Sequence, residues 1–295
     1  MAETSIPVDM LNPGQVFACL GFLELTDKLL GEAQGAFDSS EGGTRFHVRA
    51  SGDECPVKTA IQFLRSASVS SRSPSQSELS TDGWSVPTRQ IDASRDAFPI
   101  PMPDSPATLP TILSSENRCI EIDHWGDDIP SVGRDNVKFW AGAGGYPGAA
   151  LAQDALALIK AMPEDIASDP LNASARQSSS FRFDWRRDYV PLDIGFSLNA
   201  HSGDRFCTVG YPVVEMLAAI GLTHARPKRV SKLEYLYGVI ATNDGKQMLD
   251  PVFHRAALGT VPLPFSQRTF RMNLGWPGKE NQARCITTVE ELIPS

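Results

Sequence analysis

The sequence predicts an α+β protein in which a ferredoxin-like βαββαβ unit at the N-terminus packs with a second α+β half. Three observations lead to this fold class. The first 65 residues alternate strand-type and helix-type apolar spacing in the order strand, helix, strand, strand, helix, which is how a βαββαβ unit opens. A stretch rich in serine and proline follows. Mixed strand and helix patterns then resume and continue to the C-terminus.

The N-terminal elements follow from the spacing of their apolar residues. Ser5–Met10 alternates apolar and polar side chains and predicts a strand, and the stretch from Gln15 to Leu30 has the apolar spacing of a helix. Two strands, Ala36–Asp38 and Thr44–Ala50, flank a turn that contains glycine, and Pro56 opens a second helix. No clean fourth strand directly follows this helix. We expect one shared core made by Phe17, Leu20, Leu23, Phe46 and Ile61.

Residues 66–118 separate the two predicted units. This stretch of 53 residues holds 13 serines and 7 prolines, a composition with little apolar surface to offset the entropy of ordering the chain. We expect it to be a loop or insertion that is mostly irregular. The predicted organisation is therefore residues 1–65 as the ferredoxin-like unit, residues 66–118 as the insertion and residues 119–295 as the second α+β half.

The second half mixes strands and helices. A glycine-rich loop, Ala141–Gly148, precedes a predicted helix, whose first N–H groups favour an anion, but the loop lacks the Lys-Ser/Thr pair of a P-loop. A tight packing turn is therefore the favoured interpretation over a nucleotide site, and a contact to a nucleic-acid backbone is an intermediate alternative. The other expected elements are the strands Cys119–His124, Phe181–Trp185, Val190–Ile194 and Leu233–Ile240, the helices Ala149–Met162 and Pro212–Gly221, and a closing hairpin of residues 267–275 with 284–289.

Charge is unevenly distributed along the chain. The net charge of −8 disfavours a freestanding nucleic-acid binder. Residues 1–175 hold 12 Lys and Arg against 24 Asp and Glu, a net of −12. Residues 176–295 hold 15 against 11, a net of +4. The second half could therefore contact phosphates with one face, or the asymmetry could be ordinary scatter.

The cysteines and the apolar stretches indicate a compartment. Five dispersed cysteines predict neither a disulfide framework nor a CxxC zinc site. No apolar stretch has the length of a transmembrane helix, and the N-terminal residues lack the pattern of a signal peptide. We therefore expect a cytoplasmic protein without a membrane partner.

One cluster has the residue types of a metal site. Asp123, His124, Asp127 and Asp128 follow a predicted strand, and carboxylates with a histidine could hold Mg²⁺ or Mn²⁺ for phosphodiester cleavage. The spacing matches no metal motif, however, and the neighbouring glycine and proline favour a polar turn. Serine and histidine residues show no pairing that predicts a nucleophilic site.

Basic side chains in the second half are the candidate nucleic-acid contacts. Phe181–Arg187 interleaves aromatic rings with arginines, a pattern that suits single-stranded nucleic acid, although we favour burial of the rings in the core. A second basic run follows the helix that begins at Pro212, where a solvated helix exit is the alternative interpretation. The candidate contacts are Arg182, Arg186, Arg187, Arg226, Lys228, Arg229, Lys232 and Arg271.

Four segments carry a family resemblance. They are Ser5–Glu24, Phe183–Ser197, Gly210–Pro227 and Leu274–Gly278. Together they resemble CRISPR-associated proteins of subtype I-G, formerly I-U, most closely the Csx-fourteen family, with the Csb-three family as a close competitor. The resemblance extends over most of the chain outside residues 66–118 and includes no catalytic motif.

The resemblance implies a subunit of a Cascade-like, RNA-guided interference complex that acts in antiviral defence. Such complexes hold guide RNA along subunits with ferredoxin-like cores, and a separate helicase–nuclease degrades the target. The expected partners are other effector subunits, guide RNA and target DNA. No cofactor and no catalytic residue are expected. Two alternatives stay open: a metal-dependent nuclease or guide-RNA-processing enzyme that uses the Asp123 cluster, and an adaptor that binds only proteins.

Overall fold

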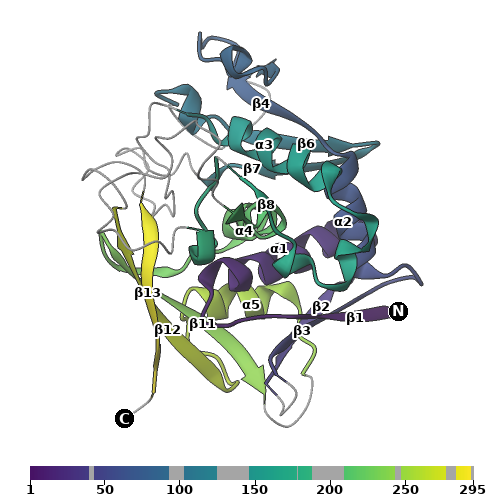
Figure 1. Cartoon of the computed structure of the whole chain (residues 1–295), viewed down its shortest axis with the longest axis vertical. Helices are drawn as coiled ribbons and strands as arrows, with labels where there is room; N and C mark the ends of the chain where they lie inside the picture. The colour runs from purple at the N-terminus through teal and green to yellow at the C-terminus, as the bar shows by residue number, and fades with distance from the viewer. Residues whose placement is uncertain are drawn as a thin grey trace.

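The computed structural model describes residues 1–39, 43–92, 103–124, 146–177, 179–187, 209–242, 247–276 and 284–293. The α+β class predicted from the sequence is confirmed. A layer of helices separates a larger sheet from a smaller one (Figure 1). None of the described helices combines the length and the apolar character needed to cross a membrane.

The larger sheet joins the two ends of the chain. Its strands are β1 (Ala2–Pro7), β3 (Arg45–Ala50), β2 (Gln34–Asp38), β11 (Glu234–Thr242), β12 (Gln267–Gly275) and β13 (Cys285–Leu292), in that spatial order. Neighbouring strands are antiparallel, except that β2 and β11 run parallel through the pairs Phe37–Ala241 and Asp38–Thr242. A short strand, β10 (Lys228–Ser231), pairs with the opening residues of β11. The antiparallel pairing of β12 with β13 confirms the predicted closing hairpin.

The described helices are α1 (Pro13–Leu30), α2 (Pro56–Ser66), α3 (Gly148–Ala161), α4 (Pro212–His224) and α5 (Pro251–Leu258). Helices α1, α2 and α5 pack against strands of the larger sheet, whereas α3 and α4 pack against strands of the smaller one. Asn12 caps the first turn of α1 by accepting from the backbone N–H of Gly14, which satisfies one of the unpaired donors at a helix start. The expected core is confirmed, because Phe17, Leu20, Leu23, Phe46 and Ile61 belong to one buried cluster.

Helices α1 and α4 approach each other unusually closely. A Cβ atom at Gly21 of α1 would overlap the carbonyl oxygen of Leu217 in α4, and one at Gly221 of α4 would overlap that of Phe17 in α1. Nearly all of α4 is buried. This contact places the N-terminus of α4 beside that of α1, and both ends take part in the site described below.

Residues 66–118, which we expected to be mostly irregular, contribute strands to the smaller sheet, although most of their described residues lie outside these strands. The strands of this sheet are β5 (Thr88–Ile91), β4 (Ser68–Pro74), β6 (Thr111–Ser115) and β7 (Arg118–Ile122), in that order. Buried hydroxyls replace part of the apolar core: the Ser71 and Thr81 oxygens lie 2.7 Å apart, and both residues are fully buried. A serine-rich composition favours a loop, but hydroxyls that bond to one another can also occupy the inner face of a sheet.

The N-terminal elements follow the predicted order. The chain forms β1, α1, β2, β3, α2 and then β4, with β3 between β1 and β2 in the sheet. Strand β4, which directly follows α2, was not predicted from the sequence. It pairs with β5 and β6 in the smaller sheet.

The expected strand Phe181–Trp185 is wrong. Arg182 has a left-handed backbone with φ of 66°, which a regular strand does not accommodate. A 3₁₀ turn, η6 (Trp185–Arg187), follows it. The expected burial of the rings is confirmed for Phe181 and Phe183, which are fully buried and stack with centroids 5.5 Å apart. The expected strand Val190–Ile194 lies outside the described residues.

Short elements complete the described chain. A two-residue ladder joins β8 (Ala175–Arg176) to β9 (Val209–Gly210). The other 3₁₀ turns are η1 (Asp82–Trp84), η2 (Pro106–Thr108), η4 (Glu164–Ser168) and η5 (Pro170–Asn172).

Candidate nucleic-acid interface

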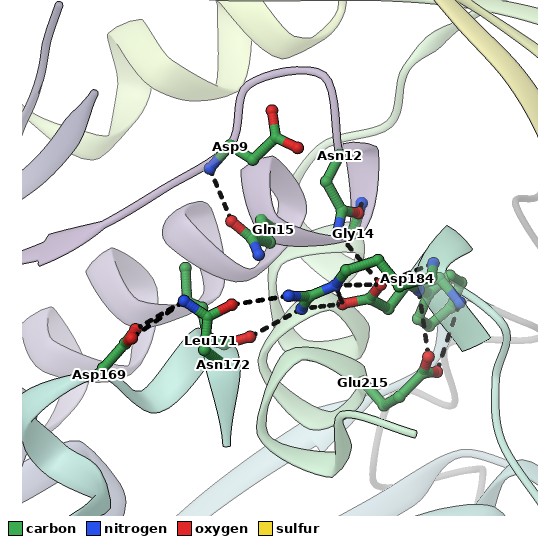
Figure 2. A network of polar contacts seen from close by, with 11 residues as sticks. Asp9, Asn12, Gly14, Gln15, Asp169, Leu171, Asn172, Asp184 and Glu215 are labelled. Atoms are coloured by element: carbon green, nitrogen blue, oxygen red, sulfur yellow. Dashed lines mark hydrogen bonds and ion pairs between the residues drawn. The ribbon is translucent and has the colours of Figure 1, made fainter. Parts of the chain in front are cut away.

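The carboxylate of Asp184 lies at the centre of a buried polar network (Figure 2). Its Oδ1 accepts a hydrogen bond of 3.1 Å from Nδ2 of Asn12, the cap residue of α1. Its Oδ2 accepts one of 2.6 Å from the guanidinium of Arg186. Asp184 and Asn12 are both fully buried, so each needs these partners in place of water.

The guanidinium of Arg186 has several partners within the protein. Besides Asp184, it donates to the side-chain oxygen of Asn172 at 2.6 Å and to the carbonyl oxygen of Leu171 at 2.8 Å. Its guanidinium carbon lies 3.5 Å from the centroid of the Tyr211 ring, a stacking contact typical of arginine. The donors of the guanidinium are therefore used within the protein, and a phosphate contact by Arg186 stays a prediction.

Glu215 completes the network from the side of α4. Its carboxylate accepts from the backbone N–H of Asp184 at 3.1 Å and faces the N–H of Phe183 at 3.4 Å. These bonds hold the backbone beside the left-handed Arg182. On the opposite side, a Cβ atom at Gly14 would overlap the carbonyl oxygen of Phe183. The backbone of Phe183 and Asp184 therefore lies between the first turns of α1 and α4 and contacts both.

Three of the segments that carry the family resemblance meet in this network. Asn12 and Gly14 come from the first, Asp184 and Arg186 from the second, and Glu215 from the third. They are far apart in the sequence and are joined only by the fold. The network is buried and internally bonded, so its chemistry is structural: it fixes the relative position of two helices and one loop.

The remaining basic candidates differ in their surroundings. Arg182 is only 9% exposed, so it does not offer a charge to a ligand at the surface. Arg271 forms ion pairs with Glu234 at 3.0 Å and Glu290 at 2.9 Å, so its charge is offset locally. Arg226 is half-buried. The side chain of Arg187 lies outside the described residues.

The exposed candidates come together on β10 and its turn. Lys228 and Arg229 lie on a strand in which every residue is exposed, and Lys232 is exposed in the turn that follows. This strand was not predicted, because the basic run has none of the apolar alternation of a strand. Because β10 pairs with β11, these charged side chains lie along an edge of the larger sheet.

Two further residues join this basic turn, and sequence reasoning missed both. Arg284 donates to the carbonyl oxygen of Lys232 at 3.1 Å. The ammonium of Lys232 lies 5.5 Å from the centroid of the Trp276 ring. Trp276 follows β12 and Arg284 precedes β13, so the hairpin brings them to one place. We call Lys228, Arg229, Lys232, Trp276 and Arg284 the basic hairpin patch.

Only two of the four residues in the predicted metal-type cluster lie in the described part of the chain. Asp123 and His124 follow β7, and the histidine is fully buried with its ring 6.2 Å from that of Phe183. Asp127 and Asp128 lie outside the described residues, as does most of the glycine-rich loop. Among the residues that are described, no group of three or more His, Cys, Asp and Glu side chains could hold a metal ion.

Comparison with known proteins gave no relative. No family model matches the chain, and neither the curated proteins nor the solved structures contain a match.

A second ionic cluster fixes the other end of the helical layer. The carboxylate of the buried Glu24 receives two hydrogen bonds of 2.6 Å from the guanidinium of Arg255, and Nδ1 of His224 lies 3.6 Å from it. The hydrogen bonds that Arg255 donates to Glu24 raise the pKa of Arg255. Burial lowers the pKa of His224 in spite of the nearby Glu24. This cluster ties α1, α4 and α5 together and resembles the Asp184 network in being structural.

Proposed function

We propose that this chain is a non-catalytic subunit of a type I CRISPR interference complex, where it contributes to complex assembly and to the binding of guide RNA or target DNA in antiviral defence. The observation that carries the proposal is the meeting of Asn12, Asp184 and Glu215 in one buried network. Each comes from a different segment that resembles the Csx-fourteen family. Residues that a family shares for structural reasons are expected to contact one another in the fold.

The N-terminal topology supports the same proposal. Strand β3 lies between β1 and β2, and α1 and α2 connect the strands as a βαββαβ unit requires. We interpret this region as a ferredoxin-like unit whose last strand, β4, has been transferred to a neighbouring sheet. Subunits with such cores line the guide RNA in Cascade-like complexes.

Electrostatics favours the second half as the nucleic-acid face. A polyanion is repelled by the net charge of −12 over residues 1–175 and attracted by the net +4 over residues 176–295. In complexes of this class base pairing reads the sequence, and the protein subunits contact mainly backbone and shape. The proposed partners are therefore other effector subunits and guide RNA or target DNA, in the cytoplasm.

Purification of the tagged full chain from its native host tests the proposal. We expect RNA derived from a CRISPR repeat array to copurify, together with other effector subunits, as read by RNA sequencing and mass spectrometry. An untagged strain is the control. Recovery of the chain without repeat-derived RNA and without any such subunit, at low as well as high salt, would contradict the proposal.

The same preparation separates the proposed function from a nuclease. Purified protein is incubated with Mn²⁺ and labelled RNA or DNA. We expect the substrates to stay intact. Metal-dependent cleavage that disappears in Asp127→Ala would instead establish the nuclease alternative, because that substitution removes a carboxylate from the only predicted metal-type cluster of the sequence.

A further inference from the structure

We propose that Leu249–Leu258 forms an acid-sensitive strap, which holds the seam between β2 and β11 at neutral pH and detaches from it in mild acid through His254, while the rest of the larger sheet stays folded. This conformational change is independent of the proposed function, because it follows from contacts within the chain.

The seam is the shortest ladder of the larger sheet. Among the described residues, β2 and β11 pair at two positions, Phe37–Ala241 and Asp38–Thr242, whereas β11 and β12 pair at seven. The seam also divides the sheet into two ribbons, β1-β3-β2 and β11-β12-β13, each of which is antiparallel throughout. Contacts from outside the two strands must therefore help to hold the ribbons together.

The strap supplies such contacts on both sides of the seam (Figure 1). On the β2 side, Gly35 and Leu249 exchange two backbone hydrogen bonds of 2.9 and 2.8 Å, and Nε2 of His254 donates to the carbonyl oxygen of Gly35 at 3.0 Å. On the β11 side, α5 lies so close to the strand that a Cβ atom at Gly238 would overlap the carbonyl oxygen of Ala257. The strap therefore bridges the two ribbons.

His254 is the titratable group of the attachment to β2. The side chain is buried, and its ring centroid lies 6.0 Å from that of Phe37 and 6.2 Å from that of Phe46. It also lines an apolar cavity with Val16 and Leu20 of α1. Burial lowers the pKa of His254 below its ordinary 6.5, because an imidazolium in these surroundings would lose its hydration. A detached strap returns the ring to water and to its ordinary pKa, so acid favours the detached state.

The charged neighbours of His254 do not cancel the effect of burial. Glu24 of α1 favours the protonated ring, but its carboxylate already accepts two hydrogen bonds of 2.6 Å from Arg255, the next residue of the strap. On β2, β3 and β11, the residues that line the cavity are uncharged: Phe37, Phe46, Gly238 and Val239. Burial is therefore the larger influence, and the neutral ring is the form that fits the attached strap.

Hydrogen–deuterium exchange of the full chain at about pH 7.5 and about pH 5.5, corrected for the intrinsic effect of pH on exchange, tests the proposal. We expect peptides that cover Leu249–Leu258 and Gln34–Phe37 to lose protection in acid. Their opening constant should rise by up to about tenfold per pH unit below the ordinary pKa, the limit for one proton. Peptides from α2, which packs against α1, β1 and β3, are the internal control and should keep their protection.

Two substitutions test the role of His254 itself. His254→Gln keeps a donor for the Gly35 carbonyl and cannot titrate in this range, so its strap should stay protected at both pH values. His254→Leu loses that bond and should show weaker protection, again without a pH dependence. The matched control is His224→Gln, which removes a histidine 3.6 Å from Glu24 and should leave the pH dependence of the strap in place.

Each outcome decides for or against the strap. Equal protection of the wild-type strap at both pH values would overturn the proposal, as would a loss of protection in α2 as large as in the strap, which indicates global unfolding. A pH dependence that persists in both His254 variants, or that disappears in His224→Gln, would assign the titration to another group. If neither His254 variant folded, the wild-type profile of strap against α2 would still decide the question.

Discussion

Asn12 donates from Nδ2 to Oδ1 of Asp184 over 3.1 Å, although 172 positions separate the two residues in the sequence. The same Asn12 side chain accepts from the N–H of Gly14 and so caps α1. One amide therefore serves a local and a long-range purpose. The stability of this corner of the fold depends on both bonds, which leads to a first prediction.

Asn12→Ala should lower the free energy of unfolding by about 2–4 kcal/mol. Loss of a helix cap costs about 1 kcal/mol, and a buried hydrogen bond to a charged group contributes about 1.5–3 kcal/mol. Urea denaturation followed by circular dichroism measures the change. Asn117→Ala, an exposed asparagine in the turn between β6 and β7, is the control and should stay within about 0.5 kcal/mol of wild type. Equal effects of the two substitutions would contradict the network.

Arg186→Ala should act on folding and not on nucleic-acid binding. Asp184 would keep a fully buried carboxylate without its main cation, and breaking such a pair costs about 3 kcal/mol. Arg186→Lys keeps the charge but loses the planar fork, so its loss should be smaller. Thermal unfolding measures both. If Arg186→Ala flattened the salt dependence of oligouridylate binding at unchanged stability, the arginine would be a phosphate contact after all.

Gly221→Ala should force α1 and α4 apart. The added Cβ atom would overlap the carbonyl oxygen of Phe17, and the backbone on both sides is buried. Overpacking of this kind costs about 3 kcal/mol or more, which exceeds the gain of about 1 kcal/mol in helix propensity. Gly83→Ala is the matched control, because nothing lies within 4 Å of its added Cβ. A folded, fully stable Gly221→Ala protein would show that the helices pack less tightly than described.

His254 should make the protein less stable in mild acid. Burial lowers the pKa of His254 below its ordinary 6.5, so below about pH 6.5 the unfolded chain binds a proton that the folded chain does not. Stability then falls as the pH falls, by at most about 1.4 kcal/mol per pH unit for one proton. His254→Gln can still donate to the Gly35 carbonyl and should flatten this dependence. Urea midpoints at several pH values measure it, and an unchanged slope in the variant would refute the assignment.

The regular elements were predictable where side-chain spacing reports burial directly. Gln15–Leu30 and the closing hairpin show such spacing and were located correctly. Strand β4 was missed, because its inward side chains include Ser71 and Ser73, which are buried by bonding and packing and not by apolar character. The exposed β10 was missed for the opposite reason, since it has no buried face.

The candidate site was predictable in composition but not in arrangement. The basic runs are visible in the sequence as the densest positive charge of the second half. It could not reveal that Arg186 is bound by Asp184 and Asn172, or that Arg271 is paired with two glutamates, because these pairs depend on the fold. Trp276 and Arg284 carried no signal at all, since only the hairpin brings them to Lys232.

The parallel pairing of β2 with β11 also imposes an order of events during synthesis. Phe37 leaves the ribosome about 200 residues before its partner Ala241, which at about 5–20 residues per second means a wait of roughly 10–40 s. Throughout that time one edge of β2 has only solvent or other chains to pair with. Nascent chains would therefore be exposed to misassembly, and a chaperone that covers Gln34–Asp38 should raise the yield of folded protein more than one that acts only after release.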